Sequence, residues 1–426
     1  MISKKYQRAI KFLESLNNIP GKNYLNYKVG KSKYDRSFYI DRLKHLLKLI
    51  GNPQDGLKYI HITGTAGKGS TTWAVHNVLR ATGCKVGSYY SPHTTTHIER
   101  IMVGKKYISP NTFANIVESL KKPITECTLN SPYGTPSYYE VSLTIALIHF
   151  ANIKCDWVVL EALLGGKYDA TNVIKNTKFA VITNIDYDHQ DVLGPTLKHI
   201  ASDKMEIIKN KSIFITTEQR PNLLKLFEKK CEKENAKFIS LKYKDGDKNN
   251  IIAKEIGKIL QIKEPLIEKS LTNIKLPCRF ETIQEVPKII VDGAHNRIKL
   301  RKTAEQIKGT KYKKLILLFS MTAGKNTEES MKEIAHLADH IIFTRALEIP
   351  GNRKTVPLGN FQDVIKKLKV KAKTSYFLDP WQALSYAISE TGVHDCLLIT
   401  GSMYLSGKLR EKWIDEEYIL KNRKSF

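Results

Sequence analysis

A glycine-rich segment, residues 64–71, is the feature that most limits what this chain can fold into. It lies between an apolar β-branched run, residues 59–62, and an amphipathic stretch, residues 70–82, and reads Gly64-Thr65-Ala66-Gly67-Lys68-Gly69-Ser70-Thr71. A strand, a glycine-rich loop and a helix in this order make a phosphate-binding loop, because glycines let successive backbone N–H groups turn toward phosphate oxygens. The alternative, a glycine-rich turn that binds nothing, is disfavoured by this flanking order. The segment therefore predicts a nucleotide-binding α/β domain.

Within this loop the side chains predict separate roles. Lys68 can reach the β- and γ-phosphates of a nucleotide, and Ser70 is placed to meet a nucleotide-bound magnesium ion. The remaining predicted nucleotide contacts are Gly64, Thr65, Gly67, Gly69 and Thr71. The spacing departs from the usual Walker form, because only two residues separate Gly64 from Gly67-Lys68 and a further glycine precedes Ser70.

The rest of the chain alternates short apolar runs with amphipathic stretches, which is typical of parallel α/β sheets. Strands are expected at residues 59–62, 86–90, 157–160 and 179–182, and again at 288–291, 314–319, 340–343 and 396–399. Helices are expected at 70–82, 140–151 and 251–271. We therefore predict a P-loop mononucleotide-binding parallel-sheet domain, residues 1–276, followed by a smaller Rossmann-like α/β domain, residues 277–426. A ligand site between two such halves is a reasonable expectation.

Composition narrows the class of protein. The 426 residues include 69 Lys plus Arg against 42 Asp plus Glu, a net charge of +27. This charge would suit phosphates, nucleic acid or acidic small molecules, but the lysines are spread over the whole length, which favours biased residue usage on solvated faces. Six scattered cysteines without metal spacing, no apolar leader and no long apolar run indicate a cytoplasmic protein without a membrane span.

Two polar side chains follow predicted strands downstream of the loop. Glu161 ends the run 157–160 and is followed by Gly165-Gly166, so its carboxylate could hold magnesium opposite the phosphates. A lone strand-end Glu would more often be a solvated cap. His189 follows the run 179–182, and a histidine in a polar loop is more often a hydrogen-bonded surface residue.

Several motifs in order resemble one family. The phosphate loop continues through Lys85-Val86-Gly87, Ser91-Pro92-His93 and Glu99-Arg100-Ile101. This series resembles folylpolyglutamate synthase and the bifunctional dihydrofolate synthase, members of the Mur ligase superfamily. The resemblance runs from about Asn18 to Arg410, and the order of the motifs carries it rather than any single one.

The resemblance implies a metal and a modified lysine in the first half. The family binds a second magnesium ion with residues that match Ser91, Glu161 and His189, so two ions are expected. In related ligases a lysine matching Lys204 is carbamylated, which would turn an ammonium into a carboxylate-like group. An exposed helical lysine is the alternative, and Met205-Glu206 departs from the family's usual Ala-Gly.

The second half carries two further motifs of the family. Pro277-Cys278-Arg279-Phe280-Glu281 resembles its Pro-Gly-Arg-Phe-Glu entry to the C-terminal domain, and residues 292–296 match its nucleotide-contacting turn. The resemblance implies nucleotide contacts from Arg279, Asp292 and His295, with Arg279 on phosphate and Asp292 on ribose hydroxyls. Cys278 replaces a glycine and Arg297 a proline, so the local backbone could differ from the family pattern.

By this resemblance the chain is expected to be an ATP-dependent ligase. ATP would phosphorylate a substrate carboxylate, and L-glutamate would attack the acyl phosphate, with Lys68, Glu161, His189 and Lys204 as the catalytic set. A reduced folate or dihydropteroate is the expected acceptor, since the 63 residues before Gly64 are too few for the uridine-nucleotide domain of the Mur ligases proper. A monomer is expected, with no nucleic acid or membrane partner.

Three alternatives stay open at this point. The first is a Mur-type ligase with a different carboxylate acceptor, since Ala66, residues 94–97 and Lys167 depart from the family; the segment Ser91 to Ile108 is expected to line the acceptor pocket. The second is a P-loop NTPase acting with nucleic acid, which would need a strand-end Asp, an arginine finger and a basic stripe with stacking aromatics. The third is a catalytically inactive binding protein, which the set of retained charged residues disfavours.

Overall fold

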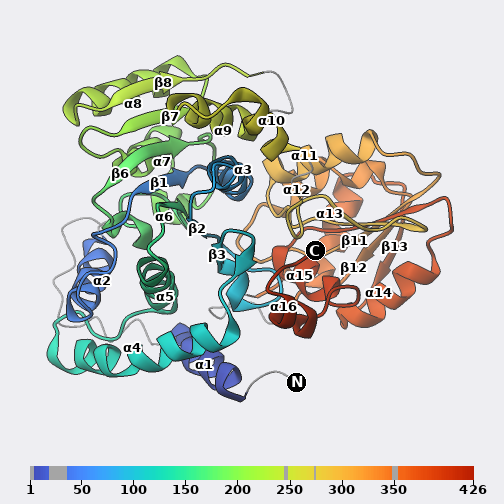
Figure 1. The fold of residues 1–426 in the computed structure, drawn as a ribbon. Coiled ribbons are helices and arrows are strands. Elements are labelled where there is room, and N and C mark those ends of the chain that lie inside the picture. The colour runs from blue at the N-terminus through green and yellow to red at the C-terminus, as the bar shows by residue number, and fades with distance from the viewer. Residues whose placement is uncertain (1–3, 19–35, 244–247, 273–274, 348–353) are drawn as a thin grey trace. The chain divides into compact units, whose positions relative to one another are not determined.

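The computed structural model describes residues 4–18, 36–243, 248–272, 275–347 and 354–426. The chain divides into two compact units, Met1–His93 with His97–Ile274, and Thr94–Thr96 with Lys275–Phe426. The change from one unit to the other falls at residues 274 and 275, against the expected 276 and 277. Each unit is an α/β structure in its own right (Figure 1).

The first unit is built on an eight-stranded sheet with the order β4-β3-β2-β5-β1-β6-β7-β8. Six strands are parallel: β1 (Tyr59–Thr63), β2 (Val86–Tyr89), β5 (Trp157–Glu161), β6 (Thr177–Ile182), β7 (Ile213–Thr216) and β8 (Lys237–Ser240). Two short edge strands, β3 (Ile101–Val103) and β4 (Lys106–Tyr107), run antiparallel. The chain leaves β1 toward β2 on one side and later returns to β6 on the other, so β1 lies at a topological switch point, where α/β sheets bind ligands.

Helices cover both faces of this sheet, and β6 shows why. Phe179 and Val181 pack into one apolar cluster with α3 (Lys68–Arg80), α9 (Lys248–Ile259) and α10 (Glu264–Leu271). The alternate residues Ala180 and Ile182 pack into a second cluster with α7 (Leu197–Lys204) and α8 (Pro221–Lys233). Successive strand residues point to opposite faces, so both faces must be apolar, and the strand appears in the sequence as a continuous apolar run.

Four helices of the first unit lie outside these two clusters: α1 (Lys4–Ser15), α2 (Ser37–Leu49), α4 (Pro110–Asn130) and α5 (Tyr138–Ile153). The short α6 (Gln190–Leu193) belongs to the second cluster through Leu193. A buried ion pair joins α2 to α5, with Arg42 Nε 2.9 Å from Glu140 Oε2. The Glu140 carboxylate also accepts the backbone N–H of Ser137, which caps the start of α5.

The second unit has a six-stranded sheet of order β13-β12-β11-β14-β10-β9. Strands β10 (Lys288–Val291), β11 (Leu315–Phe319), β12 (His340–Phe343), β13 (Lys373–Tyr376) and β14 (Cys396–Thr400) are parallel, and β9 (Glu281–Gln284) is antiparallel to β10. Its helices are α11 (Arg297–Lys308), α12 (Thr327–Lys332), α13 (Leu358–Lys367), α14 (Pro380–Ser389), α15 (Met403–Arg410) and α16 (Glu416–Asn422). Along β11, Leu315 and Leu317 face one apolar cluster and Ile316 and Leu318 the other.

These two sheets confirm the predicted α/β fold, with three corrections. Both sheets are mixed at an edge rather than wholly parallel. The single helix expected at 251–271 is two helices, α9 and α10, because Gln261 has a φ of 57° and Pro265 starts the second helix. Strands β3, β4, β7, β8, β9 and β13 were not predicted. Part of the polar section near Tyr243, residues 244–247, lies outside the described residues.

No helix among the described residues has the length and apolar character to cross a membrane. The six cysteines are free thiols; five are buried and Cys84 is partly exposed. Burial raises the pKa of Cys155, Cys231 and Cys396 to about 12, so these thiols are poor nucleophiles.

Candidate active site

The glycine-rich loop joins β1 to α3, and close contacts explain its glycines. A Cβ at Gly64 would lie 1.9 Å from the hydroxyl oxygen of Thr183 at the end of β6, and one at Gly67 would lie 2.6 Å from Asn249 Oδ1 at the start of α9. Gly67 is the N-cap of α3 with a φ of 86° and gives that helix no side-chain cap. The first backbone N–H groups of α3 therefore suit a phosphate, as expected of a helix N-terminus.

Two lysines meet on one backbone oxygen of this loop. The Lys68 ammonium lies 3.0 Å and the Lys204 ammonium 3.3 Å from the carbonyl oxygen of Gly64. Lys204 is only 4% exposed. Burial, and then the charge of Lys68, lower the pKa of Lys204 to about 7, against the opposing influence of Asp203, Asp188 and Asp169. The loop thus concentrates positive charge beside the N-terminus of α3.

Glu161 ends β5 and lies beside the first turn of α3. Its side chain is 4% exposed, and Oε2 accepts the backbone N–H of Ser91 at 3.1 Å. A Cβ on Gly69 would lie 3.4 Å from the same oxygen. The structure therefore brings Ser91, Glu161 and Gly69 together at the carboxyl ends of β2, β5 and β1.

His189 caps the short helix α6 with a left-handed φ of 51°. Its Nε2 lies 3.8 Å from Asp188 Oδ1, and its side chain is 32% exposed. Among the described residues, no three His, Cys, Asp or Glu side chains are grouped to hold a metal ion. The expected metal set contains only two such residues, Glu161 and His189, with Ser91 as the third ligand, so that assignment stays a prediction.

Gly165 and Gly166 have a role that the sequence did not suggest. The Gly166 N–H donates to Asp203 Oδ1 at 2.7 Å, and a Cβ on Gly166 would lie 2.6 Å from the backbone oxygen of Lys204. The Lys167 N–H donates to the Asp203 carbonyl at 2.9 Å. These contacts hold the last turn of α7 against the loop after β5 and so place Lys204 at Gly64.

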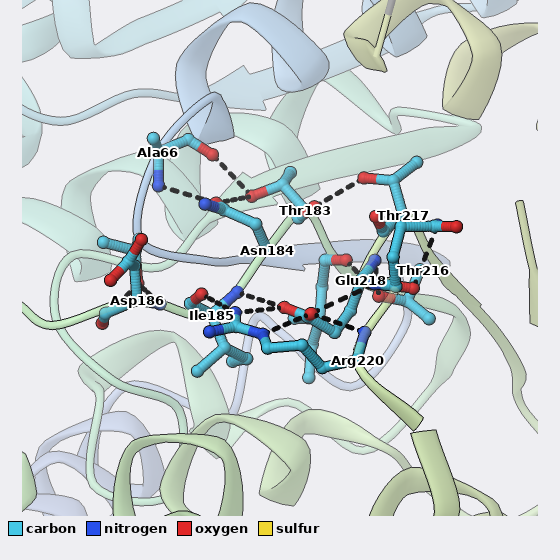
Figure 2. Close-up of polar contacts among 12 residues, drawn as sticks. Ala66, Thr183, Asn184, Ile185, Asp186, Thr216, Thr217, Glu218 and Arg220 are labelled. Carbon is cyan, nitrogen blue, oxygen red and sulfur yellow. Dashed lines mark hydrogen bonds and ion pairs between the residues drawn. The ribbon is translucent and has the colours of Figure 1, made fainter. Parts of the chain in front are cut away.

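The loop that follows β6 is hydrogen-bonded to the phosphate loop (Figure 2). The Ala66 N–H donates to Asn184 Oδ1 at 2.9 Å, and the Thr183 hydroxyl donates to the Ala66 carbonyl at 2.6 Å. The Asp186 N–H donates to the Thr65 hydroxyl at 2.9 Å. The hydroxyls of Thr65 and Thr183 are thus occupied within the protein.

Thr71 is similarly occupied. It is fully buried, and its hydroxyl donates to Asn249 Oδ1 at 3.2 Å. Ser70, one residue earlier, is only partly buried. The loop therefore offers backbone amides, Lys68 and Ser70 to a nucleotide, while Thr65 and Thr71 shape it. Asn249 was missed in the sequence, because nothing in its local pattern links it to a loop far earlier in the chain.

Ser91 contacts both Glu161 and Arg100: its backbone N–H donates to Glu161, and its hydroxyl accepts from Arg100. Arg100 is 3% exposed, its Nε donates to His93 Nδ1 at 2.9 Å, and its Nη1 donates to the Ser91 hydroxyl at 3.4 Å. The guanidinium also lies 5.5 Å from the centre of the Tyr138 ring. Within the described part of the chain no carboxylate pairs with it, which is unusual for a buried cation.

In the second unit Asp292 lies in the turn after β10, and its expected contact to ribose stays a prediction. Its carboxylate accepts the backbone N–H groups of Phe280 at 2.9 Å and Ala294 at 3.0 Å, and the Thr303 hydroxyl at 2.7 Å. A carboxylate has about four acceptor positions, so most of this one is already used. In the structure, Asp292 holds the turn itself together.

The basic side chains near this turn remain suited to an anion. A Cβ at Gly293 would lie 3.2 Å from Arg279 Nη1. His295 lies 2.9 Å from the Gly293 carbonyl through Nδ1 and 3.1 Å from the Lys299 ammonium through Nε2. Asn296 caps α11 by accepting the Lys299 N–H. Lys299, one helical turn after His295, was not singled out in the sequence, although that spacing could have indicated it.

Comparisons with known proteins agree with this geometry. Residues 62–282, more than half of the chain, match the Mur ligase middle domain, and residues 278–403 match the Mur ligase glutamate ligase domain. The dihydrofolate synthase/folylpolyglutamate synthase of Bacillus subtilis is 28% identical over 425 aligned positions, which cover 90% of this chain and 96% of that protein.

Solved structures share the whole fold. The folylpolyglutamate synthase of Thermotoga maritima is 26% identical with a TM-score of 0.76, covering 99% of this chain and 98% of its own. A bifunctional folylpolyglutamate synthase/dihydrofolate synthase solved with Mn, AMPPNP and L-glutamate has the same fold, at 21% identity and a TM-score of 0.76, over 97% of this chain and 99% of its own. The chain therefore belongs to the Mur ligase family, in the branch of the folylpolyglutamate and dihydrofolate synthases.

Proposed function

We propose that this chain is an ATP-dependent ligase that joins L-glutamate to a folate through an acyl phosphate, with a reduced folate or dihydropteroate as acceptor. The observation that carries the proposal is the Lys68 ammonium, 3.0 Å from the Gly64 carbonyl, beside the N-terminus of α3, which has no side-chain cap. Such a site suits the polyphosphate of ATP. The similarity to folate-ligating relatives over nearly the whole chain supplies the acceptor class.

The protein's contribution to such a reaction is alignment and charge neutralisation. The α3 backbone amides and Lys68 would hold the β- and γ-phosphates in line with the acceptor carboxylate, and the glutamate amine would then displace phosphate from the acyl phosphate. No side chain has to act as a covalent nucleophile. Arg279, Asp292 and His295 would supply further contacts to ATP from the second unit, and Asp292 also holds the turn together.

The residues available for a divalent ion are Ser70 for the nucleotide-bound ion and Ser91, Glu161 and His189 for a second one. A hydroxyl, a buried carboxylate and an imidazole are acceptable ligands for Mg²⁺ or Mn²⁺. The ion would neutralise charge on the transferred phosphoryl group. The solved relative with Mn and AMPPNP bound supports a divalent ion, and the expectation of two ions is part of this proposal.

Carbamylation of Lys204 is also proposed. A neutral amine is needed to add CO₂, and a pKa of about 7 leaves a large neutral fraction near physiological pH. The product would be an anion in place of a second cation at Gly64, which would relieve the repulsion from Lys68. The positions of Asp203, Gly166 and Lys167, which fix the end of α7, support a structural need for this lysine.

Arg100 would face an acidic group of the acceptor. It is a buried guanidinium without a carboxylate partner in the described residues, and it bonds to Ser91, next to Glu161. A monomer in the cytoplasm acting on small molecules without nucleic acid completes the proposal, and the free thiols are consistent with that compartment.

The test is release of phosphate from Mg-ATP by the purified chain with L-glutamate and, in turn, a reduced folate, dihydropteroate or no acceptor. Release should require both glutamate and a pterin, mass spectrometry should show the glutamylated product, and Lys68→Ala should abolish both. Release that ignores both substrates, or that nucleic acid stimulates, would contradict the proposal. Product from one pterin only would identify the acceptor.

A further inference from the structure

Glu218 and Arg220 form an ion pair immediately after β7 and contact the loop that follows β6. Arg220 Nε lies 2.7 Å from Glu218 Oε1, and Nη2 lies 2.7 Å from Oε2. The Glu218 side chain is 4% exposed and that of Arg220 38%. Burial acts to raise the pKa of Glu218, but hydrogen bonds from Arg220 and Ile185 outweigh it and lower that pKa, so the carboxylate is charged.

This pair holds both polar backbone groups of one loop residue, Ile185 (Figure 2). The Ile185 N–H donates to Glu218 Oε2 at 3.0 Å, and the Arg220 guanidinium donates to the Ile185 carbonyl. Ile185 is itself buried. The backbone of the loop after β6 is therefore fixed at this residue by two charged side chains from the next strand.

The residues on either side of Ile185 connect it to the site. Asn184 accepts the backbone N–H of Thr65 at 3.0 Å through its carbonyl and that of Ala66 through its side chain. Asp186 is bonded to the Thr65 hydroxyl through both its N–H and its carbonyl. Three residues beyond Asp186 comes His189. Ile185 thus lies at the junction between the phosphate loop and the loop that carries His189.

The sheet does not need this pair to hold β6 and β7 together. The two strands are already paired in parallel register from Phe179 to Ile182. Beyond the ladder, the Thr216 hydroxyl donates to the Ile182 carbonyl at 2.7 Å and the Thr217 hydroxyl donates to the Thr183 carbonyl. Apolar residues here could not accept the Ile185 N–H or donate to the Ile185 carbonyl, so the pair acts on the loop after β6 rather than on the sheet.

We infer that Glu218 and Arg220 are positioning residues, which set the placement of the phosphate loop relative to His189 by fixing the Ile185 backbone. The inference rests on the proposed nucleotide and metal site and adds to it two residues that contact neither ligand. Because alignment dominates phosphoryl transfer, a small displacement of one loop against the other should slow turnover without loss of the fold.

The test compares three variants of the full chain, Glu218→Gln, Arg220→Ala and Arg220→Lys, with Glu140→Gln as the matched control. Glu140→Gln breaks a buried Arg–Glu pair of the same unit, Arg42–Glu140, that has no contact with the phosphate loop. The measurements are kcat, KM for ATP, KM for the pterin acceptor, the magnesium concentration at half-maximal rate, and Tm.

For Glu218→Gln and Arg220→Ala we expect kcat to fall about tenfold to a hundredfold, with a higher magnesium requirement and an unchanged KM for the pterin. Arg220→Lys should show a smaller fall than Arg220→Ala, because lysine keeps the charge and three donors but loses the planar fork of the guanidinium. Guanidinium ion at concentrations well below those that unfold the protein should restore part of the rate of Arg220→Ala. The control should lower Tm with kcat and the magnesium requirement unchanged.

The inference is overturned if the Glu218 and Arg220 variants lower Tm as the control does while kcat and the magnesium requirement stay at wild-type values. If Glu218→Gln fails to fold, Arg220→Lys decides the question by the same measurements. Lys68→Ala separates this failure from failure of the site itself. Activity retained in Lys68→Ala would reject the nucleotide site, whereas activity lost there but kept in the pair variants would reject only the positioning role.

Discussion

The two regions proposed to contact ATP are held in place by different means. In the first unit the loops approach backbone to backbone, so that a Cβ at Gly64 or Gly166 would overlap Thr183 or the end of α7. In the second unit the turn is held by carboxylates, because Asp292 accepts from Phe280 and Ala294. Close packing therefore restricts which side chains the first region can accept, whereas hydrogen bonds fix the backbone of the second.

Two departures from the family pattern lie at the turn of the second unit. Cys278 replaces the usual glycine and still has a left-handed φ of 53°. Its N–H donates to Glu281 Oε2 at 2.9 Å, and Glu281 is paired with the buried Arg410 at 2.8 Å, so the turn keeps its conformation. Arg297 replaces a proline at the first position of α11 and lies 2.9 Å from Glu333. Side-chain partners thus hold the turn at both substituted positions.

Gly166→Ala should give the largest effect. The added Cβ would meet three backbone atoms of Asp203 and Lys204, which cannot rotate away, so the end of α7 must move. We expect a loss of about 1–3 kcal/mol in unfolding free energy and about a hundredfold in kcat. The comparison variant is Gly293→Ala in the second unit, whose Cβ would meet mainly the flexible end of Met403. Urea unfolding should show a smaller loss of unfolding free energy for Gly293→Ala than for Gly166→Ala. Equal losses would contradict the difference proposed between the two regions.

The next largest effect is expected from the protonation of Lys204, which should make the reaction rate depend on pH. Its pKa is lowered from the usual lysine value to about 7, so the neutral form predominates above pH 7 and the ammonium below it. The rate should rise roughly tenfold from pH 6 to pH 8 if the neutral amine is required. The sign is reversed if the ammonium is the active form.

Bicarbonate separates carbamylation from simple deprotonation of Lys204. At constant pH, removal of dissolved CO₂ should lower the rate and added bicarbonate should restore it. ¹³C-labelled bicarbonate should give a carbamate NMR signal in the wild type that is lost in Lys204→Arg. Full activity of Lys204→Arg without bicarbonate would exclude the modification.

Arg100 and Arg410, one buried arginine from each unit, allow a further comparison. Arg410 has its carboxylate, Glu281, whereas Arg100 has none in the described residues. Arg100→Lys should raise KM for the pterin acceptor severalfold with little change in Tm, since a lysine keeps the charge but loses the planar donor set. Arg410→Lys should instead lower Tm and leave that KM unchanged. Steady-state kinetics and thermal unfolding on both variants decide between these roles.

Cys278→Gly should give the smallest effect. Removing a side chain from a left-handed residue relieves about 1–2 kcal/mol of strain, and losing the buried thiol and its methylene costs about 1 kcal/mol. The unfolding free energy should therefore change by about 1 kcal/mol or less. A loss of several kcal/mol would mean that the Cys278 side chain, rather than Glu281 and Asp292, determines the turn.

Much of the fold could be predicted from the sequence because the central strands are buried on both faces. Strands β1, β5, β6 and β11 are continuous apolar runs and were predicted within one or two residues at each end. Edge strands such as β13, with the sequence Lys-Thr-Ser-Tyr, have no such run, since only part of each residue is buried. Their assignment depends on the neighbouring strand rather than on their own residues.

The residues of the candidate site also include some that the sequence predicted and some that it did not. The phosphate loop and the strand-end position of Glu161 could be located from local order, whereas His189 and Lys204 were singled out only by the family resemblance. Asn249, Asp203, Glu218 and Arg220 could not, because each acts on a segment distant in sequence. The bonds of Asp292 to Phe280 and Thr303 could not be predicted for the same reason, and its contact to ribose stays a prediction.

The burial of five of the six cysteines has a practical consequence for labelling. Thiol-specific fluorophores should react first with Cys84, at the end of the turn between α3 and β2, because the other sulfurs are inaccessible. Replacing Cys84 by serine would leave a chain with little background labelling in its folded form. A single new cysteine in each unit would then carry a donor and an acceptor dye, and energy transfer between them would report how the distance between the units changes with nucleotide.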